Sequence, residues 1–528
     1  MQRSTRRWKQ WIGRRDEFYN GVMPRPLSPT MSSQAIYLTA DLRRIEAAAR
    51  EREPGLMQRA GLAAAELAAR LASGEEILVL AGPGNNGGDA YETAANLRER
   101  FFRVSVVSPS PLESLPGDAR RAARRWQDGG GEILGAAPPD RRWGLVVDGL
   151  FGIGLAREIS GHYASLIDHA RAQPCARLAL DIPSGIDSDT GSVLGCALHA
   201  THTLSFIALK PGLLTLDGPD HCGEISVAGL GVDTESLLPA IGRVASREWF
   251  AAALKPRVQN FHKGMAGSVC VLGGAAGMTG AALLAARAAL KLGAGRVYVG
   301  LLDHGAPSLD AGAPELMLRH PDEALGMDLD AIVIGPGLGQ GERGEALVAA
   351  ALASEIDCVL DADALNIMAA NPDLREACAR RKADTLLTPH PGEAARLLGI
   401  DTRAVQGNRL GAAQRIAAEF NACAVLKGNG SVLATPDGRW YINRSGNPGM
   451  ASAGMGDVLA GILGALLAQG HPGERALVLG VHLHGAAADQ LALDVGGPLG
   501  ITASETIVPA RRIFNAWCAA GSAPAVRA

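Results

Sequence analysis

Several features that would assign a chain to a common class of protein are missing here. Aromatic residues make up only 4% of the 528 residues, and the formal net charge of −3 provides no basic surface for nucleic acid. No apolar run reaches about 18 residues without glycine or charge, the length that a membrane-spanning helix needs. We therefore expect a protein that works with neither nucleic acid nor a membrane.

Cysteine usage and the N-terminal composition both bear on the cellular compartment. The eight cysteines contain no C-x-x-C pair, and several lie in apolar, strand-like stretches, which favours buried reduced thiols over disulfides or a zinc site. Residues 1–30 are basic but contain no apolar segment of the kind that a secretory signal requires. We expect a cytoplasmic protein whose residues 1–35 form a basic, disordered extension.

Glycine and aliphatic residues dominate what is present. The 66 glycines and the 47% hydrophobic content suit a compact α/β protein, and 528 residues exceed what one core organises. Strand-like and helical runs alternate in two successive series, which predicts two doubly wound domains with ligands at the carboxyl ends of parallel strands. We predict domains at 36–240 and 257–518, a linker at 241–256 without a strand from residue 244 onward, and a tail at 519–528.

The apolar runs predict individual elements in both series. The first series has a helix at 55–72, a strand at 77–81, a glycine-rich loop at 82–89, and strands at 104–107, 145–148, 178–181 and 204–207. The second has a helix at 281–292, strands at 268–272, 297–301, 331–334, 358–360, 385–387 and 423–426, and a hairpin of 431–435 with 439–442.

The loop at 82–89 matches the G-x-G-x-x-G pattern that follows a strand in dinucleotide-binding folds. That pattern predicts an acidic residue about 20 positions later, but the strand at 104–107 ends in Ser108-Pro109-Ser110. A redox dinucleotide site is therefore disfavoured. The amide oxygens of Asn85 and Asn86 and the backbone amides of this loop could instead hold a cation and a phosphate together.

Two further carboxylates, Asp148 and Asp181, follow strands of the same predicted sheet. Either one alone would fit a simple loop cap. Three glycine-flanked acidic loops after parallel strands of one sheet converge on one crevice, which favours a shared site.

These motifs resemble the N-terminal epimerase domain of the NAD(P)H-hydrate repair family. They are Asn85-Asn86-Gly87-Gly88-Asp89, Asp148-Gly149-Leu150-Phe151-Gly152 and Asp181-Ile182-Pro183-Ser184-Gly185. The resemblance implies a Rossmann-like fold and a potassium site at Asn86, Asp148, Asp181 and Ser184. It implies that the hydrated dinucleotide contacts Asn85, Asn86, Gly87, Gly88, Asp89, Gly152, Ile153, Gly154, Leu155, Ala156, Arg157, Glu158 and Asp181. Asp181 is also our candidate for acid/base chemistry at the epimerised carbon.

The second series contains a small-residue loop, Gly454-Met455-Gly456-Asp457, that runs into an apolar segment with helical spacing at 458–467. Unpaired backbone N–H groups at the positive end of a helix dipole can hold an anion. A carboxylate there repels phosphate, which suggests that Asp457 takes a proton from a hydroxyl or holds a cation. An ordinary helix cap is the alternative for Asp457.

Upstream loops help to decide between those alternatives. The turn Thr388-Pro389-His390-Pro391-Gly392-Glu393 and the loop Lys427-Gly428-Asn429-Gly430-Ser431 each follow a predicted strand, and the chain contains no Walker A motif. Each alone fits a surface turn. In this order they resemble the ribokinase-like superfamily, and within it the ADP/ATP-dependent NAD(P)H-hydrate dehydratase. The resemblance implies nucleotide contacts at Lys427, Gly428, Asn429, Gly430, Ser431 and Gly456, hydrate contacts at Ala276, Gly339, His390 and Asp457, and Mg²⁺ at the phosphates.

Both resemblances together imply a bifunctional repair enzyme. It would interconvert the R and S forms of NADHX and NADPHX and would dehydrate the S form with ADP, giving AMP and phosphate, with Asp457 as the base on the substrate hydroxyl. The residues leave ADP and ATP open. One alternative is a ribokinase-like kinase of a vitamin precursor with an accessory domain, and another is a non-enzymatic scaffold. We also expect a homo-oligomer, because the alanine-rich helix at 281–292 offers a surface for assembly.

Overall fold

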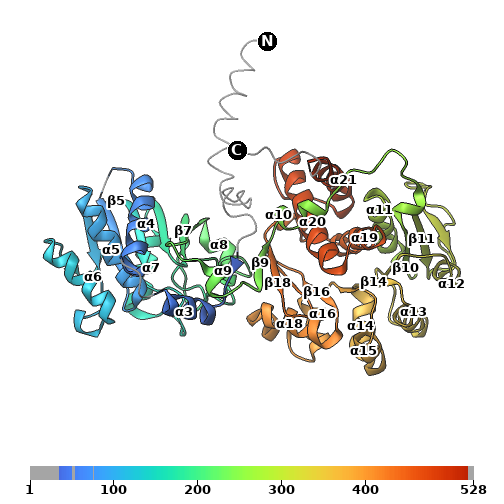
Figure 1. The fold of residues 1–528 in the computed structure, drawn as a ribbon, viewed down its shortest axis with the longest axis horizontal. Helices are drawn as coiled ribbons and strands as arrows, with labels where there is room; N and C mark the ends of the chain where they lie inside the picture. Colours follow the sequence, from blue (N-terminus) through green and yellow to red (C-terminus); the bar gives the residue numbers. More distant parts are fainter. Residues whose placement is uncertain (1–34, 50–53, 75, 521–528) are drawn as a thin grey trace, which may run out of the picture. The chain divides into compact units, whose positions relative to one another are not determined.

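The computed structural model describes residues 35–49, 54–74 and 76–520. These residues divide between two compact units, with the boundary between Val244 and Ala245. In Figure 1 the N-terminal unit runs from blue to green and the C-terminal unit from green to red. Except for Ala35, the predicted N-terminal extension lies outside the described residues.

The N-terminal unit is built on a parallel sheet in the order β4-β3-β2-β5-β6-β7-β8. Its strands are β2 (Glu76–Ala81), β3 (Val104–Val107), β4 (Ile133–Leu134), β5 (Trp143–Gly149), β6 (Ala176–Leu180), β7 (His202–Phe206) and β8 (Glu224–Ala228). Its helices are α3 (Thr39–Ala48), α4 (Leu56–Leu71), α5 (Asn85–Glu99), α6 (Gly117–Asp128), α7 (Gly161–Arg171), α8 (Gly218–Cys222) and α9 (Thr234–Leu237).

Alternation along β2 shows why this sheet is covered on both faces. Ile77 and Val79 pack into a core with α4, α5 and α6, whereas Leu78 and Leu80 pack into a second core with α7. Successive side chains of a strand point to opposite faces, so a continuously apolar strand must be buried on both. This arrangement confirms the predicted doubly wound α/β fold.

The C-terminal unit contains a second sheet, in the order β18-β17-β16-β15-β14-β13-β10-β11-β12. The strands from β16 to β12 are parallel, and β17 and β18 add an antiparallel hairpin. Their bounds are β10 (Ser268–Gly273), β11 (Arg296–Leu301), β12 (Met317–Arg319), β13 (Ala331–Ile334), β14 (Asp357–Leu360), β15 (Thr385–Leu387), β16 (Cys423–Leu426), β17 (Ser431–Ala434) and β18 (Trp440–Asn443).

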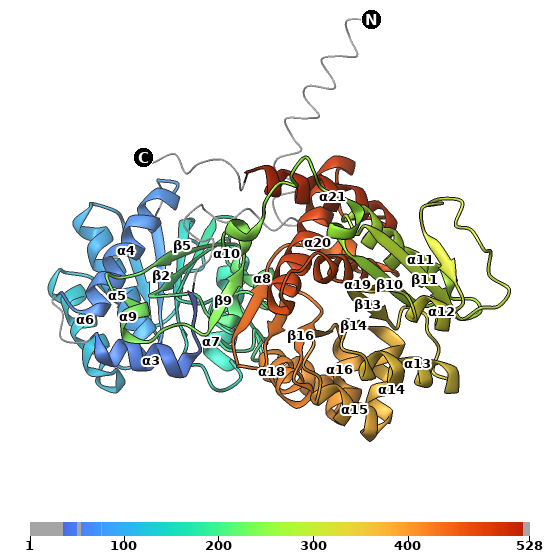
Figure 2. The ribbon, with the colours of Figure 1, turned by 45° about the vertical axis from the view of Figure 1, so that its right-hand side comes forward.

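Four helices form one apolar layer of this unit: α11 (Thr279–Lys291), α19 (Met455–Ala468), α20 (Gly473–Val495) and α21 (Ala503–Ala520). In Figures 1 and 2 they lie together, with α11 and α19 beside β10 and with α20 beside β16 and β18. The remaining helices are α10 (Arg247–Phe250), α12 (Pro321–Leu325), α13 (Glu342–Ala353), α14 (Ala362–Ala370), α15 (Pro372–Ala379), α16 (Pro391–Leu398), α17 (Thr402–Gly407) and α18 (Arg409–Phe420).

Helix α20 is long and apolar enough to cross a membrane by length and composition, but 67% of its apolar window is buried inside the unit. A buried helix in the core of a protein passes the same test of length and composition.

The eight cysteines are free thiols.

Four local expectations are wrong. Strand β9 (Gly242–Ala245) enters the stretch predicted to have no strand, because it pairs antiparallel with the distant β1 (Ala35–Ile36) rather than with a sequence neighbour. Helix α21 continues through Ala520 into the predicted tail. The loop expected at 82–89 ends at the N-cap Gly84, and α5 begins at the next residue, Asn85. The alanines of α11 are buried against α19, so they offer no surface for assembly.

Candidate active sites

The predicted epimerase residues gather at the carboxyl ends of neighbouring strands in the N-terminal unit. In the order β2-β5-β6-β7, Asn86 lies in the first turn of the helix after β2, Asp148 is the penultimate residue of β5, and Asp181 directly follows β6. Parallel strands bring these ends to one edge of the sheet. Asn86, Asp148 and Asp181 are all buried.

Asp148 and Ser184 form a closed hydrogen-bond pair. The Ser184 hydroxyl donates to Oδ1 of Asp148 at 2.7 Å, and the Ser184 backbone N–H donates to Oδ2 at 2.9 Å. Burial raises the pKa of Asp148, and these hydrogen bonds oppose that shift. The pair therefore joins the loop after β6 to the end of β5.

Asn86 presents an oxygen with no protein partner. Its Nδ2 donates to the Leu180 carbonyl at 3.2 Å, whereas Oδ1 is buried and accepts no hydrogen bond from the described residues. A buried amide oxygen without a donor is costly. A cation bound by oxygen ligands would satisfy it.

Asp181 has the most constrained backbone of this site. Its φ of +67° lies in the left-handed region, which is uncommon for a residue with a side chain. Oδ1 forms an ion pair with Lys210 and also accepts from Phe206 N–H at 3.4 Å, and Oδ2 accepts from Ile153 N–H at 3.3 Å. Strained residues of this kind concentrate at functional sites.

Lys210 is the residue that the sequence prediction missed in this site. Its ammonium contacts Asp181, the Ser205 hydroxyl at 2.8 Å and the Phe206 carbonyl at 3.0 Å. The available signal was a lysine placed directly after the apolar run Ile207-Ala208-Leu209 that follows a buried strand. Charged residues are almost never fully buried unless they are paired.

The other predicted hydrate contacts differ in their surroundings. Gly87 and Gly88 lie in closely packed surroundings, since a Cβ on Gly87 would lie 2.0 Å from the Gly82 carbonyl oxygen and one on Gly88 2.5 Å from Cε of Met57. Packing alone thus accounts for both glycines. Asp89 is different: burial, and next the charge of Asp181, raise its pKa well above the ordinary value. The loop at 152–158 is largely exposed at the rim.

In the C-terminal unit, Asp457 lies in the first turn of α19, three residues after the N-cap Gly454 with its φ of +88°. The helix has no side-chain cap, so the simple capping role is not what the structure contains. Burial raises the pKa of Asp457 from its ordinary 3.8 to about 6, with Asp361 adding to the shift and Lys427 opposing it.

Lys427 lies between two carboxylates beside this helix. Its ammonium is 2.8 Å from Oδ1 of Asp361 and 3.9 Å from Oε2 of Glu393. Both acids are buried, and Thr388 Oγ1 donates to the same oxygen of Asp361 at 2.7 Å. A Cβ on Gly456 would lie 3.2 Å from Nζ of Lys427, so this glycine lets the ammonium approach the helix N-terminus.

Asp361 and Glu393 were not among the predicted site residues. The available signals were an acid directly after β14 and an acid in the first turn of α16. Glu393 also accepts the His390 backbone N–H at 2.7 Å.

His390 has a defined neutral tautomer. Its Nδ1 accepts from the Gly392 N–H at 3.0 Å, so the ring proton sits on Nε2, which lies 3.3 Å from Oε1 of Glu393. Partial burial and then Lys427 lower the pKa of His390, which keeps the ring neutral.

The remaining predicted contacts lie on neighbouring loops. Gly339 follows β13 with a φ of +74° and donates its N–H to Oδ2 of Asp363 at 2.9 Å. Ala276 lies on the loop after β10, the strand next to β13. The turn at 428–431 follows β16 and is closed by a hydrogen bond from the Ser431 hydroxyl to the Gly428 carbonyl at 3.0 Å. Strand order places these loops at the edge of the sheet that carries Lys427.

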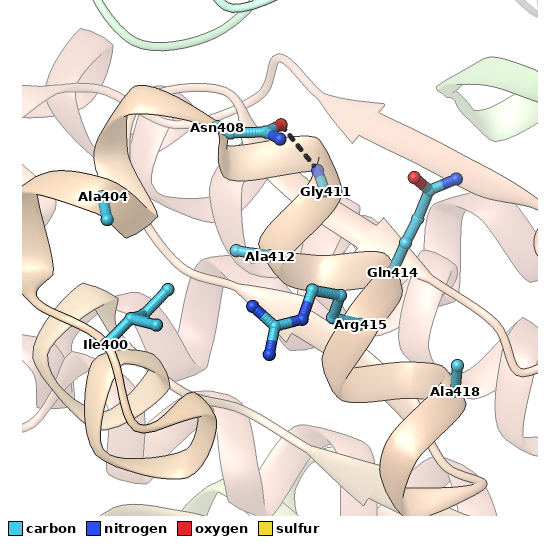
Figure 3. Close-up of a pocket in the computed structure, with 8 residues that line it drawn as sticks. All are labelled: Ile400, Ala404, Asn408, Gly411, Ala412, Gln414, Arg415 and Ala418. Atoms are coloured by element: carbon cyan, nitrogen blue, oxygen red, sulfur yellow. Dashed lines mark hydrogen bonds between the residues drawn. The ribbon is translucent and has the colours of Figure 1, made fainter.

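A separate groove lies between α17, α18 and the turn after α16, with a cavity volume of about 440 Å³ (Figure 3). Small side chains line it, and Arg415 and Gln414 lie along its rim. None of the predicted site residues lines this groove.

Comparisons with known proteins agree with both halves of the prediction. Residues 53–212 match the family described as YjeF-related protein N-terminus, and residues 269–508 match the family described as NAD(P)H-hydrate dehydratase. The C-terminal unit is thereby assigned to the ribokinase-like fold that the resemblance implied, and the N-terminal unit to the Rossmann-like one.

Individual relatives cover nearly the whole chain. The bifunctional NAD(P)H-hydrate repair enzyme of Escherichia coli (strain K12) is 39% identical over 479 residues, covering 87% of this chain and 89% of that protein. The corresponding enzyme of Coxiella burnetii is 38% identical over 492 residues, covering 91% and 99%. The crystal structure of the ADP/ATP-dependent NAD(P)H-hydrate dehydratase from Bacillus subtilis, co-crystallised with ATP/Mg²⁺, is 31% identical, covers 52% of this chain and 98% of that one, and superimposes with a TM-score of 0.47. The chain therefore belongs to the family of bifunctional NAD(P)H-hydrate repair enzymes.

Proposed function

We propose that this protein repairs hydrated nicotinamide dinucleotides in two steps. The N-terminal unit would interconvert the R and S forms of NADHX and NADPHX, and the C-terminal unit would dehydrate the S form with ADP, giving AMP and phosphate. The observation that carries the proposal is Asp457, a half-buried carboxylate with a pKa of about 6 at a helix N-terminus beside Lys427. A base with a pKa near the working pH is well suited to removing a proton.

The dehydration follows from the chemistry of the hydrated ring. Its C6 carries a hydroxyl, and hydroxide is a poor leaving group. Asp457 would take the hydroxyl proton as the oxygen attacks the terminal phosphorus of ADP, which releases AMP. Loss of phosphate from C6 and of a proton from C5 then restores the double bond. The N-terminal amides of α19 and Lys427 would stabilise the charge on the transferring phosphoryl group.

We assign the other predicted contacts by their positions around Asp457. Lys427, Gly428, Asn429, Gly430, Ser431 and Gly456 would bind the nucleotide, and Ala276, Gly339 and His390 would bind the hydrate. The neutral ring of His390 supports such a role, because its half-exposed side chain can contact the hydrate without adding charge to the site.

Magnesium fits the donor set of this site. Asp361 and Glu393 supply two buried carboxylates for the one ammonium of Lys427, and Mg²⁺ is usually bound by one or two carboxylates together with substrate phosphates. These two residues would hold it, and it would neutralise charge on the phosphates. The Bacillus subtilis relative was co-crystallised with ATP/Mg²⁺, which supports the same use of nucleotide and metal here.

Potassium fits the N-terminal unit. The orphaned Oδ1 of Asn86, with the oxygens of Asp148 and Ser184, offers the all-oxygen donor set that a hard cation prefers. Asp181 would contribute through its backbone carbonyl, because Oδ1 of its side chain is already paired with Lys210 and Oδ2 would serve in proton transfer. Bound potassium would hold the loops after β5 and β6 together and attract the anionic dinucleotide.

Epimerisation requires only a proton relay. Asp181 would take the C6 hydroxyl proton as the C6–N1 bond opens to an aldehyde, and the proton would pass to N1 with the released electron pair. Re-addition of N1 to the other face of the carbonyl would reverse these transfers. The hydrate would lie against Asn85 to Asp89 and the rim loop at 152–158.

Location and assembly complete the proposal. A cytoplasmic location is supported by the substrates, since reduced nicotinamide dinucleotides and ADP belong to central metabolism. A homo-oligomer is supported by three exposed apolar side chains at the end of α20 and just after it: Leu493, Val495 and Leu499. Light scattering on the purified protein tests the oligomer.

One assay tests the function. Purified protein is incubated with chemically hydrated NADH and either ADP or ATP, and the absorbance of the reduced nicotinamide is followed. Conversion of both epimers is expected, and Asp457→Ala should abolish it while leaving R/S exchange intact. Conversion that stops near half would mean that only the dehydratase works. Absence of conversion, with phosphorylation of a free vitamin precursor, would favour the kinase alternative.

A further inference from the structure

Lys210 is a buried ammonium whose hydrogen-bonding capacity is used up. It is 1% exposed, and its three hydrogens face Oδ1 of Asp181, the Ser205 hydroxyl and the Phe206 carbonyl. An ammonium has three donors and no acceptor. With all three committed to protein atoms, Lys210 has no hydrogen left to give to a substrate, so it does not act as the general acid itself.

The two oxygens of Asp181 are consequently unequal. Oδ1 faces Lys210 and the Phe206 N–H, both at the end of β7. Oδ2 points the other way, toward the loop after β5, where its one partner among the described residues is the Ile153 N–H at a long 3.3 Å. A Cβ placed on Gly152 would lie 3.0 Å from Oδ2 and 3.3 Å from Cβ of Asn86. The missing side chain at Gly152 therefore leaves space beside the less engaged oxygen.

We propose that Lys210 is a positioning residue of the epimerase site, which locks Oδ1 of Asp181 and leaves Oδ2 as the oxygen that exchanges the proton with the hydrated ring. This inference rests on the proposed epimerase function. It assigns Gly152 a role as well, since only glycine leaves the approach to Oδ2 open.

A purely structural role explains the arrangement less well. Replacing a buried ion pair by apolar residues is often neutral or stabilising, so folding alone does not require one at this position. The pair instead holds an aspartate whose left-handed backbone is strained, and such strain persists where the surroundings over-determine the conformation. Orientation of a reacting group is worth such a cost, because a misplacement of about 1 Å can lower a rate by about 100-fold.

The test uses Lys210→Gln, which keeps two donors but no charge, and Lys210→Ala, in the full-length protein. R/S exchange is measured by chromatographic separation of the epimers over a range of hydrate concentrations. We expect kcat for exchange to fall by roughly 100-fold with KM within about threefold, because the group that is lost does not touch the hydrate. Methylammonium should restore exchange in Lys210→Ala by filling the ammonium position.

Two measurements separate this outcome from misfolding. Dehydration of pure S form by the C-terminal unit of the same chain should stay unchanged, and the thermal unfolding midpoint, although lowered by the loss of one partner of a buried ion pair, should stay above the assay temperature. Lys382→Met removes an exposed lysine and should change neither activity. Gly152→Ala should abolish exchange as well, whereas Gly229→Ala, with no atom within 4 Å of the added carbon, should not.

Failure of the proposed epimerase function and failure of the positioning role of Lys210 give different results. If the unaltered protein does not exchange epimers faster than the spontaneous rate, the proposed function fails. If it does, but Lys210→Gln retains exchange within about threefold, the positioning role is wrong. A rise in KM with unchanged kcat, or a loss in Lys210→Ala that methylammonium does not reverse, would likewise overturn it.

Discussion

At the scale of single residues, the proposed chemistry of both units depends on a carboxylate that lies near one ammonium. Asp457 lies near Asp361 and Lys427, and the burial of its carboxylate outweighs the attraction of the lysine. Asp181 has Lys210 directly on Oδ1. Each unit thus combines a carboxylate that we propose to react with a lysine that is fixed by other protein groups.

Dehydration should lose activity on the acid side of pH 6. Asp457 acts as a base only when ionised, and its pKa is raised from 3.8 to about 6 by burial and by Asp361, against the opposing effect of Lys427. We expect kcat/KM for the S hydrate to fall about tenfold per pH unit below that pKa. The measurement is a pH–rate profile at saturating ADP. An acid limb near pH 4 would contradict the assigned base.

Asp457→Asn should stabilise the C-terminal unit at neutral pH while abolishing dehydration. The folded pKa lies above the unfolded one, so the folded state binds the proton more tightly and the ionised carboxylate costs stability above about pH 6. That cost, about 3 kcal/mol from a shift of this size, disappears as the pH falls below the ordinary pKa of 3.8, where both states are protonated. Urea unfolding at several pH values should show a gain that vanishes as the pH falls. A gain independent of pH would point to packing instead.

Some of the candidate site residues could be predicted from the sequence and others could not. Asp457, Lys427 and Asp181 could be found because each belongs to a local motif. Lys210 could not, since its partner Asp181 is 29 positions away and only the pairing of β6 with β7 brings them together. Asp361 pairs with Lys427 across 66 positions for the same reason.

At the scale of elements, close packing of helices sets the position of the catalytic helix α19. Gly461 on α19 faces α11, and a Cβ there would lie 2.0 Å from the Ala285 carbonyl oxygen. Gly461→Ala should therefore lower the free energy of unfolding by about 1–3 kcal/mol, as overpacking does. Gly407→Ala is the matched control: Gly407 is a helical glycine with nothing within 4 Å of the added carbon, so it should be neutral or stabilising by up to about 1 kcal/mol. The measurement is urea unfolding of both variants. Equal changes in the free energy of unfolding would contradict the packing argument.

Helix α20 anchors the loop that leads to Asp457. Asp489 accepts the Gly446 N–H at 2.9 Å through Oδ2 and the Asn447 side chain at 3.0 Å through Oδ1. Asp489→Ala should free this loop and lower kcat for dehydration by roughly 10- to 100-fold, because orientation is lost. Asp494→Ala, on the exposed end of the same helix, is the control and should have no effect. Unchanged kcat in Asp489→Ala would show that the loop is held by its other contacts.

The elements themselves were largely predictable. Strands such as β3, β13, β15 and β16 coincide with the apolar runs, because buried parallel strands read as continuous aliphatic stretches. Strand β9 could not be predicted in this way, since a strand of four residues has no clear periodicity of its own and β9 depends on a partner some 200 residues away.

At the scale of the whole molecule, each unit has its own sheet, its own core and its own candidate site. The family relationship explains why both occur on one chain. Hydration produces two epimers and the dehydratase would consume one, so an epimerase would return the other to use. No step of this scheme requires the hydrate to remain bound between the two reactions.

Two inactive chains should therefore complement each other in solution. Asp457→Ala would lack dehydration and Asp181→Ala would lack exchange, so neither alone should convert a racemic hydrate completely: the first should give no conversion, and the second should stop near half apart from slow spontaneous exchange. A mixture should convert nearly all of it, because the S form made by one chain diffuses to the other. The measurement is the final absorbance of the reduced nicotinamide at several concentrations of the first chain. Conversion in the mixture that stops near half, with each single activity intact, would mean that the hydrate passes between sites of the same chain without release.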